Sequence, residues 1–180
     1  ALSLGGDGVT YREWAGWVDR VAVHLEGLGV KPGDRINGCA ANSLEYCTLT
    51  LSSMRVGVTI APLNTRFTAH ELLEIVEDHA PTVIFAEAEQ VGKFADTGVA
   101  VHDIADIAGF RAGDAATPKH DPQPDACVLI ISTSGSTAKP KGVMFSHRTM
   151  LSYITANAME DGALRDGGGV DRHQAGSCPR

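Results

Sequence analysis

Long apolar runs and closely spaced pairs of cysteines are both missing from this 180-residue sequence. No stretch reaches the roughly 18 consecutive apolar residues that a membrane-spanning helix requires, so we expect no membrane span. The first residues hold neither a basic segment nor a long apolar segment, so we expect no signal peptide. The four cysteines show no CxxC spacing, which favours free thiols in a reducing compartment over a metal or disulfide site. The resulting expectation is a cytoplasmic protein.

An excess of positive charge is missing as well. The chain has 15 basic and 22 acidic residues, which gives a formal net charge of -7. Most of such a surface repels a polyanion, so we expect no nucleic-acid partner. A small phosphate ligand is still compatible with this charge because it needs only a local site. Hydrophobic residues make up 43% of the chain, which is enough for an ordinary globular core.

Helical and strand periods alternate along the chain, and this alternation predicts an α/β fold of layered sheets with flanking helices. Capping boxes at Thr10/Glu13 and Thr68/Glu71 each predict the start of a helix. Trp14 and Trp17 fall at helical spacing, which predicts core packing. The predicted helices cover residues 11–28, 42–56, 69–79 and 146–158, and the predicted strands cover residues 35–40, 58–62, 82–85, 99–102 and 126–132.

Two further segments are predicted to lack regular structure. Residues 109–125 contain three prolines and are predicted to be a loop or linker. Residues 161–180 hold five glycines and almost no large apolar residue, so we expect a disordered or non-native tail there. The expected organisation is therefore a partial domain over residues 1–160, followed by this tail.

The histidines of the third predicted helix do not form a metal site in this interpretation. His70 and His79 are nine residues apart, whereas two ligands on one helix face are typically four apart. The sequence therefore favours a solvent-facing position for both.

The segment Ser132–Gly142 directly follows a buried strand and carries the residue types that bind phosphate. Its hydroxyl groups and backbone N–H groups can donate to phosphate oxygens, and Gly135 permits close approach of the backbone. Lys139 and Lys141 add positive charge, and Pro140 stiffens the chain between them. The segment does not contain the GxxxxGK[ST] pattern of a Walker A loop. On composition alone, a solvated linker remains the alternative.

The order of residues decides between these alternatives. Thr133-Ser134-Gly135-Ser136-Thr137 followed by Pro140-Lys141-Gly142 closely resembles the phosphate-binding signature of the adenylate-forming superfamily. Weaker similarities precede it at residues 10–14 and 55–64. The ending Pro62-Leu63-Asn64 is more similar to acyl-CoA synthetases than to amino-acid-activating domains. The resemblance covers residues 2–158, and it implies the incomplete N-terminal domain of the adenylate-forming fold.

This resemblance implies an activity, cofactors and site residues. The complete enzyme would join a carboxylic acid, such as a fatty acid, to ATP with Mg²⁺, and would then transfer the acyl group to coenzyme A. His147 matches a position near the acyl pocket, and a structural role at the start of a helix is equally compatible with it. The residues implied to hold the β- and γ-phosphates are Thr133, Ser134, Gly135, Ser136, Thr137 and Lys141, with Gly142 completing the motif and Thr137 nearest the metal.

Two departures from the family pattern change the expectations. The family usually has glycine at the position of Ala138, and an alanine there either shifts the loop or orders it in advance. The chain also has no counterpart of the adenine pocket, the Tyr-Gly-x-Thr-Glu motif, the ribose-binding Asp, the hinge or the C-terminal lysine. We therefore expect a fragment without catalytic residues of its own, with unpaired sheet edges that favour an oligomer or aggregate. A catalytically dead nucleotide- or partner-binding module and the product of a disrupted gene are the alternatives.

The missing motifs predict that the purified 180-residue chain forms no measurable acyl-CoA. Contacts to the phosphates alone lack most of the interactions that stabilise the transition state of the ligation. The test is a thioester assay with ATP, Mg²⁺, coenzyme A and fatty acids of several lengths, with a full-length acyl-CoA ligase as the positive control. Thioester formation that depends on both ATP and coenzyme A would contradict the prediction.

Overall fold

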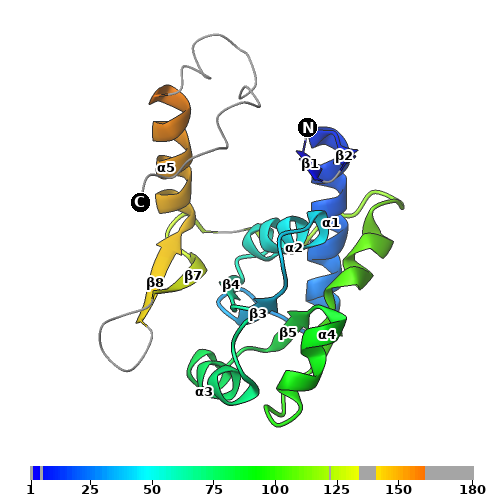
Figure 1. The fold of residues 1–180 in the computed structure, drawn as a ribbon. Helices are drawn as coiled ribbons and strands as arrows, with labels where there is room; N and C mark the ends of the chain where they lie inside the picture. The colour runs from blue at the N-terminus through cyan, green and yellow to red at the C-terminus, as the bar shows by residue number, and fades with distance from the viewer. Residues whose placement is uncertain (1, 5, 122, 134–140, 161–180) are drawn as a thin grey trace. The chain divides into compact units, whose positions relative to one another are not determined.

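The structure is a computed structural model that describes residues 2–4, 6–121, 123–133 and 141–160. The chain divides into two units, Ala1–His147 and Arg148–Arg180. The first unit holds all the strands and the helices α1 to α4, and the described part of the second unit continues the helix α5 (Figure 1). The predicted tail at residues 161–180 lies outside the described residues.

A six-stranded sheet forms the centre of the first unit, with the strand order β6-β5-β3-β4-β7-β8. Its first five strands run parallel to one another, and β8 pairs antiparallel with β7. The strands are β3 (Arg35–Cys39), β4 (Thr59–Pro62), β5 (Val83–Ala86), β6 (Val101–Asp103), β7 (Cys127–Thr133) and β8 (Lys141–Ser146). A separate two-stranded sheet pairs β1 (Leu2–Leu4) with β2 (Asp7–Val9).

The main helices begin where the sequence predicts. Thr10 and Thr68 each form a complete capping box, and Ser43 caps its helix by accepting a hydrogen bond from the Tyr46 N–H at 3.0 Å. The helices are α1 (Tyr11–Gly27), α2 (Leu44–Arg55), α3 (Ala69–His79), α4 (Ala88–Val91) and α5 (His147–Glu160), and two 3₁₀ segments are η1 (Gly92–Phe94) and η2 (Ile104–Phe110).

Helices cover the two faces of the sheet and create two apolar clusters. On one face, Trp17 of α1 and Leu49 of α2 pack with Ile36 and Ile60 of the sheet. On the other face, Leu72 of α3 packs with buried residues such as Ile84 and Phe94. The crossovers from β3 to β4 and from β4 to β5 run in opposite directions across the sheet. Because such connections are right-handed, α2 and α3 lie on opposite faces. The predicted α/β fold of layered sheet and helices is confirmed.

Sequence reasoning missed the strand β8 and the β1–β2 hairpin. Lys141 begins β8, whereas the sequence predicts it to be part of the phosphate segment Ser132–Gly142. The short strands β1 and β2 escaped because three residues are too few to show a period of two. Pro62 ends β4, which confirms its predicted place at a strand terminus.

The described residues include three of the four cysteines. Cys39, Cys47 and Cys127 are free, and burial raises the pKa of the Cys39 thiol to about 11. Cys178 lies outside the described residues. Within the described ranges, none of the helices combines the length and the apolar character that crossing a membrane requires.

The solvent-facing position predicted for His79 is wrong. Only 7% of His79 is exposed, because α3 brings its last residue against the sheet. The fully buried Asn37 donates from Nδ2 to the Ala61 carbonyl at 3.0 Å and lies 3.0 Å from His79 Nδ1. A carbonyl oxygen only accepts hydrogen bonds, so the NH₂ group of Asn37, and not its oxygen, faces the Ala61 carbonyl. The same NH₂ group lies against His79, so Nδ1 of His79 must be the acceptor of the second bond. The imidazole is therefore neutral, with its hydrogen on Nε2.

This pair predicts that the protein loses stability in mild acid. Burial lowers the pKa of His79 below its ordinary value, with Asp78 opposing the shift and Arg35 adding to it. A histidine with a lowered pKa in the folded state contributes its full stability above about pH 6.5, and this contribution falls as the pH drops towards the folded-state pKa. The free energy of unfolding should fall over this interval with a slope of at most about 1.4 kcal/mol per pH unit for this group.

Urea unfolding between pH 7.5 and 5, followed by tryptophan fluorescence, measures this slope. His79→Gln keeps an acceptor but cannot titrate, so its slope should be smaller. A residual slope is expected because burial also lowers the pKa of His24. An unchanged slope in His79→Gln, or a parent protein that becomes more stable towards pH 5, would show that His79 is not held neutral.

Candidate functional site

The predicted phosphate segment connects two paired strands of the main sheet. The last residue of β7, Thr133, pairs with the first residue of β8, Lys141. Ser134, Gly135, Ser136, Thr137 and the departure from the family pattern, Ala138, lie between them and outside the described residues. The ladder of β7 and β8 continues through Ser132↔Gly142, Ile131↔Val143 and Ile130↔Met144. Cross-strand pairing therefore fixes both ends of the segment.

The segment leaves the sheet at the edge where α/β proteins bind ligands. β7 runs parallel to β4, with Ile60 opposite Leu129, so Thr133 lies at the carboxyl end of a parallel strand. Ligands of open α/β sheets bind outside the carboxyl ends of the strands. The segment's hydroxyl groups, backbone N–H groups and lysines are donors or cations, and this set fits a polyphosphate chemically.

Gly142, the last glycine of the motif, has a packing role. A Cβ atom at this position would lie 2.7 Å from Ile130 Cγ2. Ile130 is only 9% exposed and is branched at Cβ, so its methyl group cannot easily move away. Glycine therefore allows β8 to lie flat against the β7 side chain beside it.

His147 lies at the opposite end of β8 from Lys141, where the phosphate segment ends. The histidine follows the last residue of β8, whereas Lys141 is the first residue of that strand. The six residue-to-residue steps between them along an extended strand correspond to roughly 20 Å. His147 Nε2 lies 2.8 Å from the Met54 carbonyl and donates to it. That carbonyl belongs to the last turn of α2 and also accepts a hydrogen bond from the Gly57 N–H at 3.2 Å. The contact that the structure gives His147 is thus a helix-end contact.

An acidic hollow lies near the same edge of the sheet, so its charge is opposite to that of the lysines of the phosphate segment. Its volume is about 380 Å³, and its lining includes the carboxylates of Glu45, Glu87, Glu89 and Asp103. Two of these carboxylates bind backbone, because Glu87 accepts from the Ala41 N–H and Asp103 from the Ala105 N–H. Four acidic side chains disfavour a phosphate ligand there. Among the described residues no group of histidine, cysteine and acidic side chains is arranged to hold a metal ion.

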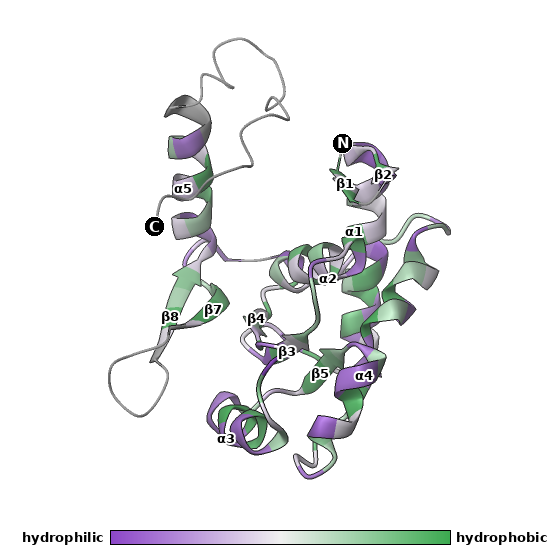
Figure 2. Ribbon diagram, viewed as in Figure 1, coloured by the Kyte–Doolittle hydropathy of each residue, from purple (hydrophilic) through white to green (hydrophobic). Residues whose placement is uncertain are grey.

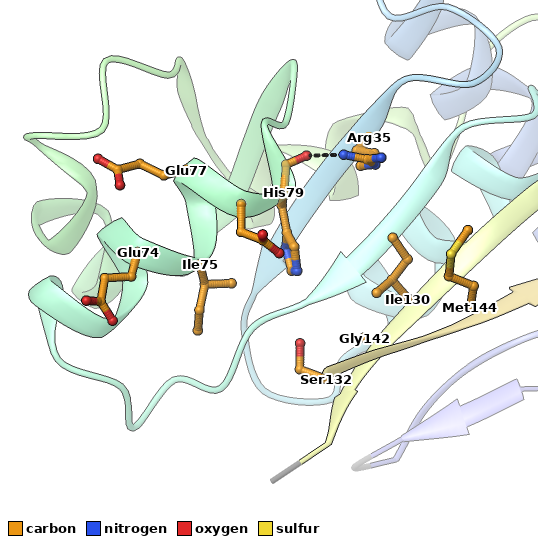
Figure 3. A pocket seen from close by; sticks show the side chains of 10 residues that line it. Arg35, Glu74, Ile75, Glu77, His79, Ile130, Ser132, Gly142 and Met144 are labelled. Atoms are coloured by element: carbon orange, nitrogen blue, oxygen red, sulfur yellow. Dashed lines mark hydrogen bonds between the residues drawn. The ribbon is translucent and has the colours of Figure 1, made fainter. Parts of the chain in front are cut away.

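A larger cavity of about 530 Å³ lies on the α3 face of the sheet (Figure 3). Ile75 and His79 of α3 line one side, and Ile130 and Met144 of the hairpin line the other. Sequence reasoning missed this cavity because its two walls are about sixty residues apart along the chain. The sequence does carry a signal for this wall of the cavity. Ile130 and Ser132 are two residues apart, as are Gly142 and Met144, and these four positions share one face of a hairpin.

Comparison with known proteins places the chain in a family. The family model described as AMP-binding enzyme matches residues 1–172. The fatty acid–[acyl-carrier-protein] ligase ScoC of Streptomyces coeruleorubidus is 32% identical over 169 residues, which are 89% of this chain and 32% of ScoC. The phosphinothricin tripeptide synthetase PhsC of Streptomyces viridochromogenes is 32% identical over 143 residues, which are 78% of this chain and 13% of PhsC.

Solved structures share the fold. ATP-bound MatB from Rhodopseudomonas palustris superposes with a TM-score of 0.75 at 28% identity, over 88% of this chain and 33% of MatB. The chain therefore spans about a third or less of the length of these relatives. The matching proteins include ligases of fatty acids and synthetases of other products.

The contact of Gly142 with Ile130 predicts that Gly142→Ala destabilises the hairpin. Overpacking of this kind typically costs about 1–3 kcal/mol of unfolding free energy. Gly109→Ala is the matched control, because a Cβ atom at Gly109 meets no atom within 4 Å. Urea unfolding of both variants measures the difference. Equal stability of Gly142→Ala and Gly109→Ala would mean that Ile130 does not constrain this position.

Proposed function

Because the chain belongs to the AMP-binding enzyme family, we propose that it is the N-terminal part of an ATP-dependent ligase of the acyl-CoA synthetase type. The complete enzyme activates a carboxylic acid as an acyl-adenylate and then passes the acyl group to coenzyme A. The observation that carries this proposal is the hydroxyl-rich segment between Thr133 and Lys141, which joins two paired strands at the carboxyl edge of a parallel sheet.

Within this proposal, the hairpin segment holds the triphosphate of ATP. Ser134, Ser136 and Thr137 donate hydroxyl hydrogens to phosphate oxygens, Gly135 offers its backbone, and Lys141 supplies positive charge. Thr137 is the residue nearest Mg²⁺. When bound, the ion offsets the charge of the phosphate oxygens.

The proposed acid is a fatty acid. Two observations support this choice over an amino acid: the Pro62-Leu63-Asn64 ending and the match of 89% of the chain to ScoC, which is named as a fatty acid ligase. The equal identity to PhsC, named as a tripeptide synthetase, supports an amino acid as the second candidate.

The phosphate assignment predicts that ATP with Mg²⁺ binds the chain and that Lys141→Ala weakens this binding at least tenfold. Removing one charge-assisted hydrogen bond costs about 1.5–3 kcal/mol, which corresponds to a factor of ten or more. Titration calorimetry with ATP measures the affinity of each variant. Lys31→Ala is the control, because Lys31 is an exposed lysine of the turn before β3.

The outcomes separate the alternatives. Weaker ATP binding in Lys141→Ala, with unchanged ATP binding in Lys31→Ala, supports a nucleotide site in the hairpin segment. Equal affinity in Lys141→Ala and Lys31→Ala would move the ATP site elsewhere. If the parent chain binds no ATP, the remaining interpretation is that the chain is an inert fragment.

A further inference from the structure

We propose that the cavity between α3 and the β7–β8 hairpin is the seat of an amphipathic helix with basic residues along its flanks, supplied by the remaining polypeptide of the ligase. We call this cavity the α3–hairpin groove, and define it by Glu74, Ile75, Glu77, Asp78, Ile130 and Met144. The inference rests on the proposed function, because it takes the chain to be one part of a larger enzyme.

The groove lies where one helix layer of the sheet is incomplete. α3 packs over β5 and β3 through Leu72 and Val76, which belong to the same buried cluster as Ile84 and Cys39. The neighbouring hairpin presents Ile130 and Met144 to the same side, since the two residues are cross-strand partners (Figure 3). Met144 is 66% exposed. An apolar sheet face in an α/β protein is covered by helices, so a second helix beside α3 completes the layer.

The hairpin has the composition of strands that are buried on both faces. Figure 2 shows β7 and β8 coloured as hydrophobic along most of their length. Ile131 and Val143, on the face opposite the groove, are each 44% exposed. Strands that are apolar on both faces occur where both faces are covered. These hairpin side chains are partly exposed, so the hairpin can accept a further covering element.

The charge of the groove selects a basic occupant. Glu74, Glu77 and Asp78 are exposed and lie on one face of α3, at the spacings of three and four residues that place helical side chains side by side. Glu74 lies 3.9 Å from His70, also exposed. Among the lining residues that the structure describes, Arg35 is the one basic residue, and it donates to the His79 carbonyl at 2.9 Å. Lysine or arginine beside the apolar stripe of the occupant complements this rim.

The same charge disfavours a second copy of this chain. Two copies would bring two acidic α3 rims together, and the whole chain carries a formal net charge of -7. The source that the comparisons offer is the rest of a ligase, because the chain spans 32% of ScoC and 33% of MatB. About two thirds of such an enzyme is then available to supply the helix.

The test uses the 180-residue chain and two synthetic 18-residue peptides with the same leucine stripe, one flanked by lysine and the other by glutamate. Methyl NMR signals of Met144 and Ile130 report occupancy of the groove. We expect the lysine peptide to shift both signals and to bind at least tenfold more tightly than the glutamate peptide. The double variant Glu74→Lys/Glu77→Lys should reverse this preference.

The matched control is Glu45→Lys/Glu89→Lys, which changes the same charge in the acidic hollow at the other site and should leave lysine-peptide binding unchanged. Equal binding of the two peptides, or an unchanged preference in Glu74→Lys/Glu77→Lys, would overturn the proposal. Shifts of Met144 that depend on protein concentration without peptide would also overturn it, because a second copy would then occupy the groove. Tryptophan fluorescence verifies that each variant is folded.

ATP titration of the same samples separates this proposal from the proposed function. Lys141→Ala should weaken ATP binding and leave peptide binding unchanged. Peptide binding without ATP binding would reject the phosphate assignment alone, and ATP binding without peptide binding would reject the groove alone.

Discussion

The antiparallel pairing of β7 with β8 is the constraint on which the account depends. β7 joins the parallel sheet through β4, and among the described strands β8 pairs with β7 alone. Because Thr133 and Lys141 are cross-strand partners, the hydroxyl-rich segment begins and ends at one point of the sheet edge. A linker of the same composition would have no such anchors. Gly142 contributes to the pairing by leaving space for the Ile130 methyl group.

One hairpin therefore serves two proposed purposes. The phosphate segment connects its two strands, and one face of the hairpin forms a wall of the α3–hairpin groove through Ile130 and Met144. An occupant of the groove would rest on strands that carry the phosphate segment. In the complete enzyme, packing of a helix against Ile130 and Met144 would fix the hairpin to the rest of the sheet, since packed interiors resist displacement.

Local signals explain how much could be predicted from the sequence. The capping boxes at Thr10 and Thr68 predicted helix starts, because their hydrogen bonds involve residues only three apart. The phosphate motif was found from its residue order. The strand β8 was not, since its pairing with β7 depends on contacts across a loop. Burial of His79 was missed because the Asn37 that faces it is 42 residues away, and no local pattern reports such a contact.

The most direct test of the central claim is a set of amide ¹⁵N–¹H NMR spectra recorded while ATP with Mg²⁺ is added to the 180-residue chain. We expect the largest shifts at Thr133, Lys141 and Gly142, at the ends of the segment, and unchanged signals for Glu87 and Glu89 in the acidic hollow. Largest shifts at Glu87 and Glu89, or none at Thr133 and Lys141, would contradict the claim that this hairpin holds the triphosphate.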